Sequence, residues 1–110
     1  MIRLLILLFP LQAFALSPAA QEFMQISKEL EPVQCEKRQL RRRMALAEAE
    51  QRDADVKAAR TRFAQLNKDP KNAKLEKRLA ELEPRLRNSS DPDDLPAISL
   101  QQREAFYRCD

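Results

Sequence analysis

The chain has 110 residues, enough for one domain, and contains no Gly, no His, no Trp and two Cys. Charged residues make up 34% of it, and its formal net charge is only +3. Without Gly there is no phosphate-binding glycine loop and no dinucleotide fingerprint. Without His there is no Ser-His-Asp triad and no imidazole zinc site, and two cysteines are too few for an all-cysteine zinc site. We therefore expect no enzyme: no catalytic residues, no cofactor-binding residues and no metal ligands.

The first 15 residues have the three parts of a secretory signal peptide. Arg3 supplies a basic start, Leu4–Phe9 is an unbroken apolar run, and Ala13–Ala15 fits the small-x-small rule for cleavage. We predict that residues 1–15 are removed as a signal peptide. Residues 16–110 then form a single small domain that is exported, either to a periplasm or to the medium.

An uncleaved membrane anchor is the alternative interpretation of this N-terminus. The apolar stretch Leu4–Ala20 is interrupted by Pro10 and Gln12, whereas a spanning helix needs about 20 apolar residues. The runner-up function follows from this alternative. It is a membrane-anchored structural protein whose helices project outward from an uncleaved N-terminal segment.

Cys35 and Cys109 are the only thiols in the chain. In an exported protein, two cysteines most simply form one intramolecular disulfide. A catalytic or redox cysteine would need a Cys-x-x-Cys pair or a partner His, and the sequence has neither. We predict a structural disulfide, with an intermolecular bridge as the alternative.

The rest of the chain predicts an all-α fold. Ser17 and Pro18 are a typical N-cap and first helical residue. No Pro or Gly occurs between Val33 and Leu66, which favours one long helix there. The predicted helices span residues 18–31, 32–66, 71–88 and 99–109, with a polar linker at residues 89–97.

The predicted architecture is a helical hairpin with its turn at Asn67–Pro70. The long helix pairs with the shorter antiparallel helix 71–88, and the disulfide ties a short C-terminal helix back onto this pair. Leucines at 75, 79, 82 and 86 form an apolar seam that is too short for a confident coiled coil and is typical of a core stripe. We expect Leu79 and Leu82 to pack against Val56, Ala59 and Phe63.

A cluster of basic residues, named here the basic block, consists of Lys37, Arg38, Arg41, Arg42 and Arg43. One interpretation is a solvated face partly neutralised by the acidic residues of the linker, Asp91, Asp93 and Asp94. The other is a docking surface for an anionic partner, such as lipid head groups or an acidic protein patch. Nucleic acid is not expected, because no aromatic side chain is interleaved with the basic residues.

These patterns predict a function of macromolecular binding without catalysis, as an adaptor, an inhibitor or a chaperone-like module. A protein is the leading partner and an anionic membrane surface is the second. No small-molecule substrate is expected.

Overall fold

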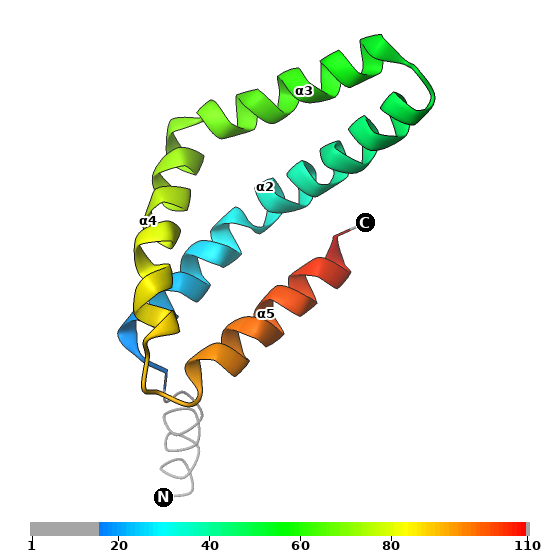
Figure 1. Ribbon diagram of the computed structural model, residues 1–110. Coiled ribbons are helices and arrows are strands. Elements are labelled where there is room, and N and C mark those ends of the chain that lie inside the picture. Colours follow the sequence, from blue (N-terminus) through cyan, green and yellow to red (C-terminus); the bar gives the residue numbers. More distant parts are fainter. Residues whose placement is uncertain (1–15, 110) are drawn as a thin grey trace, which may run out of the picture.

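The computed structural model describes residues 16–109, and all regular secondary structure in this range is helical. The helices are α2 (Pro18–Ala49), α3 (Asp53–Lys68), α4 (Pro70–Arg87) and α5 (Asp94–Arg108). Figure 1 shows α3 running back along the second half of α2, α4 continuing along its first half, and α5 lying apart from α3. The predicted all-α class, a helical hairpin and the tied-back C-terminal helix are confirmed, although the hairpin turns at a different place from the one predicted. The predicted signal peptide lies outside the described residues.

The first helix is longer than predicted. Ser17 caps it as expected, because its Oγ accepts from the backbone N–H of Ala20 at 3.2 Å and Pro18 occupies the first turn. Pro32 does not end the helix, so the predicted boundary between residues 31 and 32 is wrong. Pro32 lies on an exposed face, where the backbone hydrogen bond that its missing N–H forfeits does not leave a buried carbonyl unpaired.

The predicted helix 32–66 is also wrong, because the chain reverses direction at Glu50–Arg52. Gln51 has a φ of 58°. The Arg52 N–H donates to Ala47 O at 2.8 Å, and the Gln51 N–H donates to Glu48 O at 3.1 Å. This pair of bonds is the Schellman motif, which usually has Gly at the left-handed position. A glutamine takes that position here, so the hairpin turn carries no glycine signal.

We expect Gln51→Gly to stabilise the protein by about 0.5–1 kcal/mol, because a left-handed residue with a Cβ costs about 1–2 kcal/mol and Gly has a larger entropy cost of its own. The urea unfolding midpoint measures this. Arg60→Gly, at an exposed position in the middle of α3, is the control and should destabilise by about 1 kcal/mol. A loss of stability in both variants would contradict the left-handed conformation of Gln51 at this turn.

The predicted break at Asn67–Pro70 is present, but it is a bend and not the hairpin turn. Asp69 caps α4, since its Oδ1 accepts from the N–H groups of Lys71 at 3.0 Å and Asn72 at 3.2 Å. Pro70 occupies the first turn of α4, where a missing N–H costs nothing. The chain continues along α2 in the same general direction after this bend (Figure 1).

The core is a seam along α2 made of three clusters of buried side chains. Towards the hairpin turn, Leu40 of α2 packs with Ala59 and Leu66 of α3. In the middle, Leu82 of α4 packs with Ile26 and Leu30. The third cluster joins α2, α4 and α5 through Ala20, Leu86 and Ile98.

The leucine seam of α4 therefore has different neighbours from those predicted. Leu79 and Leu82 pack against the first half of α2 and not against α3. Val56, Ala59 and Phe63 belong to α3, which precedes the bend and covers the second half of α2. The sequence pattern indicated the apolar residues correctly. Because it did not predict the turn at Gln51, it assigned those residues to the wrong partners.

The last helix begins at Asp94, five residues before the predicted start at Ser99. Pro96 falls in its first turn, where the helix needs no N–H. Asp94 is fully buried, and its carboxylate accepts from Ser17 N at 3.0 Å, Ser17 Oγ at 2.6 Å and Ser89 Oγ at 2.8 Å. These bonds attach the start of α5 to the start of α2.

The hydrogen bonds to Asp94 make stability depend on pH. Burial alone raises the pKa of this carboxyl, but the bonds from Ser17 and Ser89 outweigh burial and hold the pKa below its usual value. A lowered pKa stabilises the fold above the unfolded value of about 3.9, and this stabilisation is lost as the pH falls through the folded value.

We expect Asp94→Asn to lower the free energy of unfolding by about 3 kcal/mol at pH 7, because hydrogen bonds to a charged group are worth about 1.5–3 kcal/mol each. Urea unfolding at pH 7, 4 and 3 should show the difference between the variant and the wild type shrinking as the pH falls. A difference that stays constant with pH would contradict the assigned role.

Candidate functional site

The structure divides the basic block between different surroundings. Lys37 is buried, with 5% of its surface exposed, and its Nζ pairs with Glu76 of α4 at 2.8 Å. Arg41 is exposed and lies over the Phe63 ring at 5.7 Å. Arg38 is half-buried and faces α5, and its guanidinium lies 4.9 Å from the Phe106 ring centre.

The two remaining members of the basic block, Arg42 and Arg43, are exposed. The acidic linker does not neutralise them. Its Asp94 is bound to Ser17, and Ser17 lies about 38 Å along α2 from this part of the block. The expected neutralisation by the linker is wrong, because α5 starts beside the N-terminus of α2.

A disulfide joins Cys35 of α2 to Cys109 just after α5, with the Cα atoms 5.5 Å apart. Beside it, Arg108 pairs with Glu31 at 2.8 Å. The hydrogen bonds from Arg108 lower the pKa of Glu31. The predicted intramolecular disulfide is confirmed, and the far end of α5 is thereby attached to the middle of α2.

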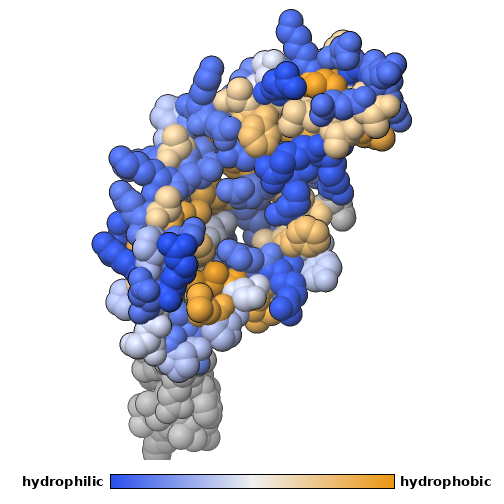
Figure 2. Space-filling model, viewed as in Figure 1, coloured by the Kyte–Doolittle hydropathy of each residue, from blue (hydrophilic) through white to orange (hydrophobic). Residues whose placement is uncertain are grey.

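Between its two attached ends, α5 contacts the rest of the protein sparingly. Ile98 and Asp94 are its only buried residues among those described. A cavity of about 270 Å³ lies between the middle of α5 and the facing parts of α2 and α4, and residues of all three helices line it. We call this cavity the α5 groove. Figure 2 shows apolar side chains gathered between α4 and α5, surrounded by hydrophilic ones.

The lining of the α5 groove is partly apolar and partly polar. Its apolar side chains come from all three helices and include Phe23, Leu30 and Leu79. Its polar side chains include Arg38 and Gln101. The Gln101 Nε2 donates to the backbone carbonyl of Met24 at 2.8 Å, which fixes this amide across the space between α5 and α2.

Two buried polar atoms at the α5 groove have no hydrogen-bond partner within residues 16–109: Arg38 Nη1, a donor, and Gln101 Oε1, an acceptor. Buried polar groups are paired in the great majority of cases, and an unpaired one costs about 1–3 kcal/mol. A donor and an acceptor that belong to two residues lining one hollow are suited to a ligand that offers the opposite pair.

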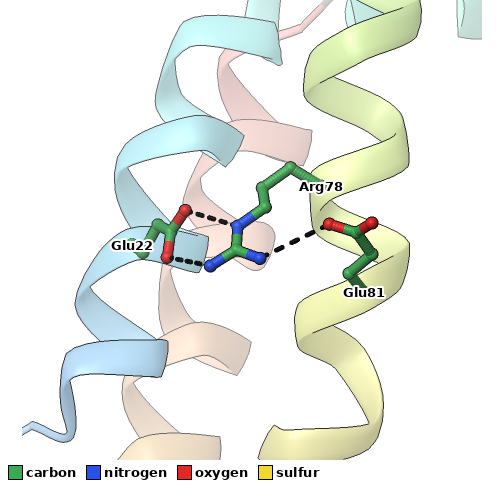
Figure 3. A network of polar contacts seen from close by, with 3 residues as sticks. All are labelled: Glu22, Arg78 and Glu81. Atoms are coloured by element: carbon green, nitrogen blue, oxygen red, sulfur yellow. Dashed lines mark hydrogen bonds and ion pairs between the residues drawn. The ribbon is translucent and has the colours of Figure 1, made fainter.

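A network of charged side chains holds the α4 wall of the groove against α2 (Figure 3). Arg78 donates to Glu22 from Nε at 2.6 Å and from Nη2 at 2.8 Å, and it lies 3.4 Å from Glu81. The bonds from Arg78 lower the pKa of Glu22 and those from Glu22 raise the pKa of Arg78. Since Glu22 and Arg78 precede Phe23 and Leu79, the network fixes two of the groove's apolar residues.

Large apolar side chains on α5 are exposed, and one of them, Phe106, contacts the groove residue Arg38. They are Leu95 at 54%, Leu100 at 53%, Phe106 at 55% and Tyr107 at 74% of their surface. Phe106 and Tyr107 form an edge-to-face pair with ring centres 5.8 Å apart. Exposed aromatic residues are enriched where proteins bind one another.

No family model, curated protein or solved structure matches this chain. Within residues 16–109, no group of three or more Cys, Asp or Glu side chains is placed to hold a metal ion. None of the helices described is long and apolar enough to span a membrane.

In the sequence, Arg38 stands out only as one member of a charge cluster, and Gln101 does not stand out at all. Neither residue has a distinctive pattern around it. The available signal was the predicted disulfide, because a bridge at Cys35 brings the last turn of α5 next to the α2 turn that carries Arg38.

Proposed function

We propose that this is a small exported helical protein that acts by binding another protein, as an adaptor, inhibitor or chaperone-like module, and that it has no catalytic activity. The α5 groove is the observation that carries the proposal. Its lining is largely apolar, includes residues with an unpaired buried donor and acceptor, and has the exposed ring of Phe106 against Arg38. Such a mixture of apolar surface with a few polar groups is typical of recognition sites.

The proposed location outside the cytoplasm has two supports. A disulfide between Cys35 and Cys109 fits an oxidising compartment. The first 15 residues have the sequence pattern of a signal peptide. Cleavage after Ala15 would leave Leu16 as the first residue, and Leu16 packs against the cluster formed by Ala20, Leu86 and Ile98.

The division of the basic block favours a protein partner over an anionic membrane surface. Binding to a charged membrane gains about 1 kcal/mol for each basic side chain near the surface. Lys37 is paired in the interior, and Arg38 faces the groove, so the block offers three exposed arginines and not five basic groups. We propose no nucleic-acid partner.

Site-specific photo-crosslinking tests the binding proposal. A photoreactive amino acid replaces Gln102, an exposed residue lining the groove, and in a matched control it replaces Thr61 on the exposed side of α3. After irradiation of producing cells, we expect one discrete protein adduct from position 102 and none from position 61. Equal adducts from both positions, or none from position 102, would contradict a partner that docks at the groove.

N-terminal sequencing of the protein from the producing cells separates the proposal from its alternative. A chain that begins at Leu16 supports an exported, cleaved protein. An intact Met1 in the membrane fraction would overturn the proposed export and support the membrane-anchored structural protein.

A further inference from the structure

We propose that the α5 groove binds the free carboxyl end of a peptide whose last side chain is apolar. This inference rests on the proposed function, since it names the part of a protein partner that the groove takes. It is carried by the charge, hydrogen-bonding capacity and size of the groove.

Among the residues that the structure describes, the groove has one positive charge without a counter-charge. Two charged residues line it, Glu31 and Arg38. Glu31 is already paired with Arg108, whereas Arg38 has no ion pair among the described residues. The ring of Phe106 lies 4.9 Å from the Arg38 guanidinium and holds it in place. A carboxylate complements this guanidinium better than any neutral group, because charge-assisted bonds are about twice as strong.

The unpaired acceptor adds a second requirement. Gln101 uses its Nε2 to donate to Met24 O, which leaves its buried Oε1 to accept a bond. A carboxylate cannot supply that bond, because it has no hydrogen to donate. The last peptide N–H of a chain lies next to the terminal carboxylate and can donate to Gln101 while the carboxylate accepts from Arg38. A fatty acid offers a carboxylate and an apolar chain but has no such N–H.

The size of the groove and its apolar lining define the rest of the ligand. At about 270 Å³ the cavity is smaller than the range of about 300–1,000 Å³ that is usual for drug-sized ligands, so it suits a single residue. Phe23, Leu30 and Leu79 are the apolar contacts available to its side chain. An apolar residue of leucine size at the end of a peptide satisfies all three requirements.

N-acetyl-L-leucine is the probe, because it has the terminal carboxylate, one N–H and the apolar side chain. Titration of the oxidised protein, followed by two-dimensional nitrogen-15 NMR, should give saturable shifts at the Gln101 side-chain amide and the Arg38 Nε. N-acetyl-L-leucinamide, which lacks the charge, should bind at least about tenfold more weakly. So should 4-methylpentanoate, which keeps the carboxylate and apolar tail but lacks the N–H.

Two variants assign these preferences to residues. Arg38→Gln should abolish the preference for the acid over the amide, whereas Arg42→Gln, an exposed member of the basic block, should keep it. Gln101→Leu should abolish the preference for N-acetyl-L-leucine over 4-methylpentanoate. Helix content measured by circular dichroism confirms that each variant is folded.

The inference is overturned if the acid and the amide bind wild-type protein equally, if acetate alone binds as well as N-acetyl-L-leucine, or if the shifts lie outside the groove. Equal binding of 4-methylpentanoate would overturn the assignment to a peptide end and indicate a fatty acid. Any of these results together with a photo-adduct at position 102 would leave the proposed function standing. Saturable binding of the probe without that adduct would support the groove and contradict the proposed function.

Discussion

Replacement of Cys35 and Cys109 by Ser is expected to lower the free energy of unfolding by up to about 4.5 kcal/mol while leaving most of the helix content in place. The bridge spans a sequence separation of 74, and closing so long a loop removes much of the entropy of the unfolded chain. The contacts of α2 with α3 and α4 do not include either cysteine. Urea unfolding followed by circular dichroism measures both quantities.

The effect of the double variant should be concentrated in α5. Its described residues beyond Ile98 are not buried, and their hydrogen bonds, ion pairs and ring contacts with α2 come from Gln101, Arg108 and Phe106. Amide hydrogen exchange should become much faster at residues 101–108 and change little in α4. Unchanged exchange at residues 101–108 would show that the disulfide does not hold this helix.

Leu82→Ala should lower the free energy of unfolding by about 3–4 kcal/mol. Leu82 is fully buried between α4 and α2, in contact with the cluster of Ile26 and Leu30. Removal of a buried leucine side chain loses its transfer free energy and leaves a cavity. Chemical unfolding at neutral pH measures the loss.

The matched control is Leu100→Ala on α5, whose side chain is 53% exposed. It should change the free energy of unfolding by no more than about 0.5 kcal/mol. A double-mutant cycle of Leu82→Ala with Leu30→Ala should show coupling, and a cycle with Ala59→Ser should show none. Coupling to Ala59 in place of Leu30 would contradict the packing of Leu82 on the first half of α2 and would support the hairpin predicted from the sequence.

Local signals in the sequence were sufficient for the first helix start and the disulfide. Ser17 with Pro18 starts a helix as predicted, and a new helix follows the predicted break at Asn67–Pro70. The main error was the hairpin turn. Gln51 adopts a left-handed conformation that sequence patterns associate with Gly, and the chain around it is rich in helix-forming residues. Tertiary packing of Leu40 on Ala59 and Leu66 stabilises a turn that the local sequence does not announce.

The start of α5 was missed for a related reason. Two prolines, Pro92 and Pro96, suggested that the linker continues to residue 97. Pro96 in fact occupies the first helical turn, and Asp94 gains its hydrogen bonds from Ser17, which is 77 positions away in the sequence. A local pattern contains no information about such a partner.

The candidate site was the least predictable part of the molecule. Lys37 and Arg38 are adjacent in a basic run, yet one pairs with Glu76 of α4 and the other lines the groove below α5. Which neighbour each side chain meets depends on the positions of α4 and α5, and those depend on the turn at Gln51. The unpaired Oε1 of Gln101 follows from one hydrogen bond to Met24 and has no sequence signature.

The yield of the photo-adduct at position 102, compared between the wild-type protein and the variant with both cysteines replaced by Ser, tests most directly whether the groove held together by the disulfide is the binding site. We expect a strong adduct from the wild-type protein and a several-fold weaker one from the variant at a temperature where both are folded, because freeing α5 removes one wall of the groove. An equal yield from the two proteins would contradict this expectation.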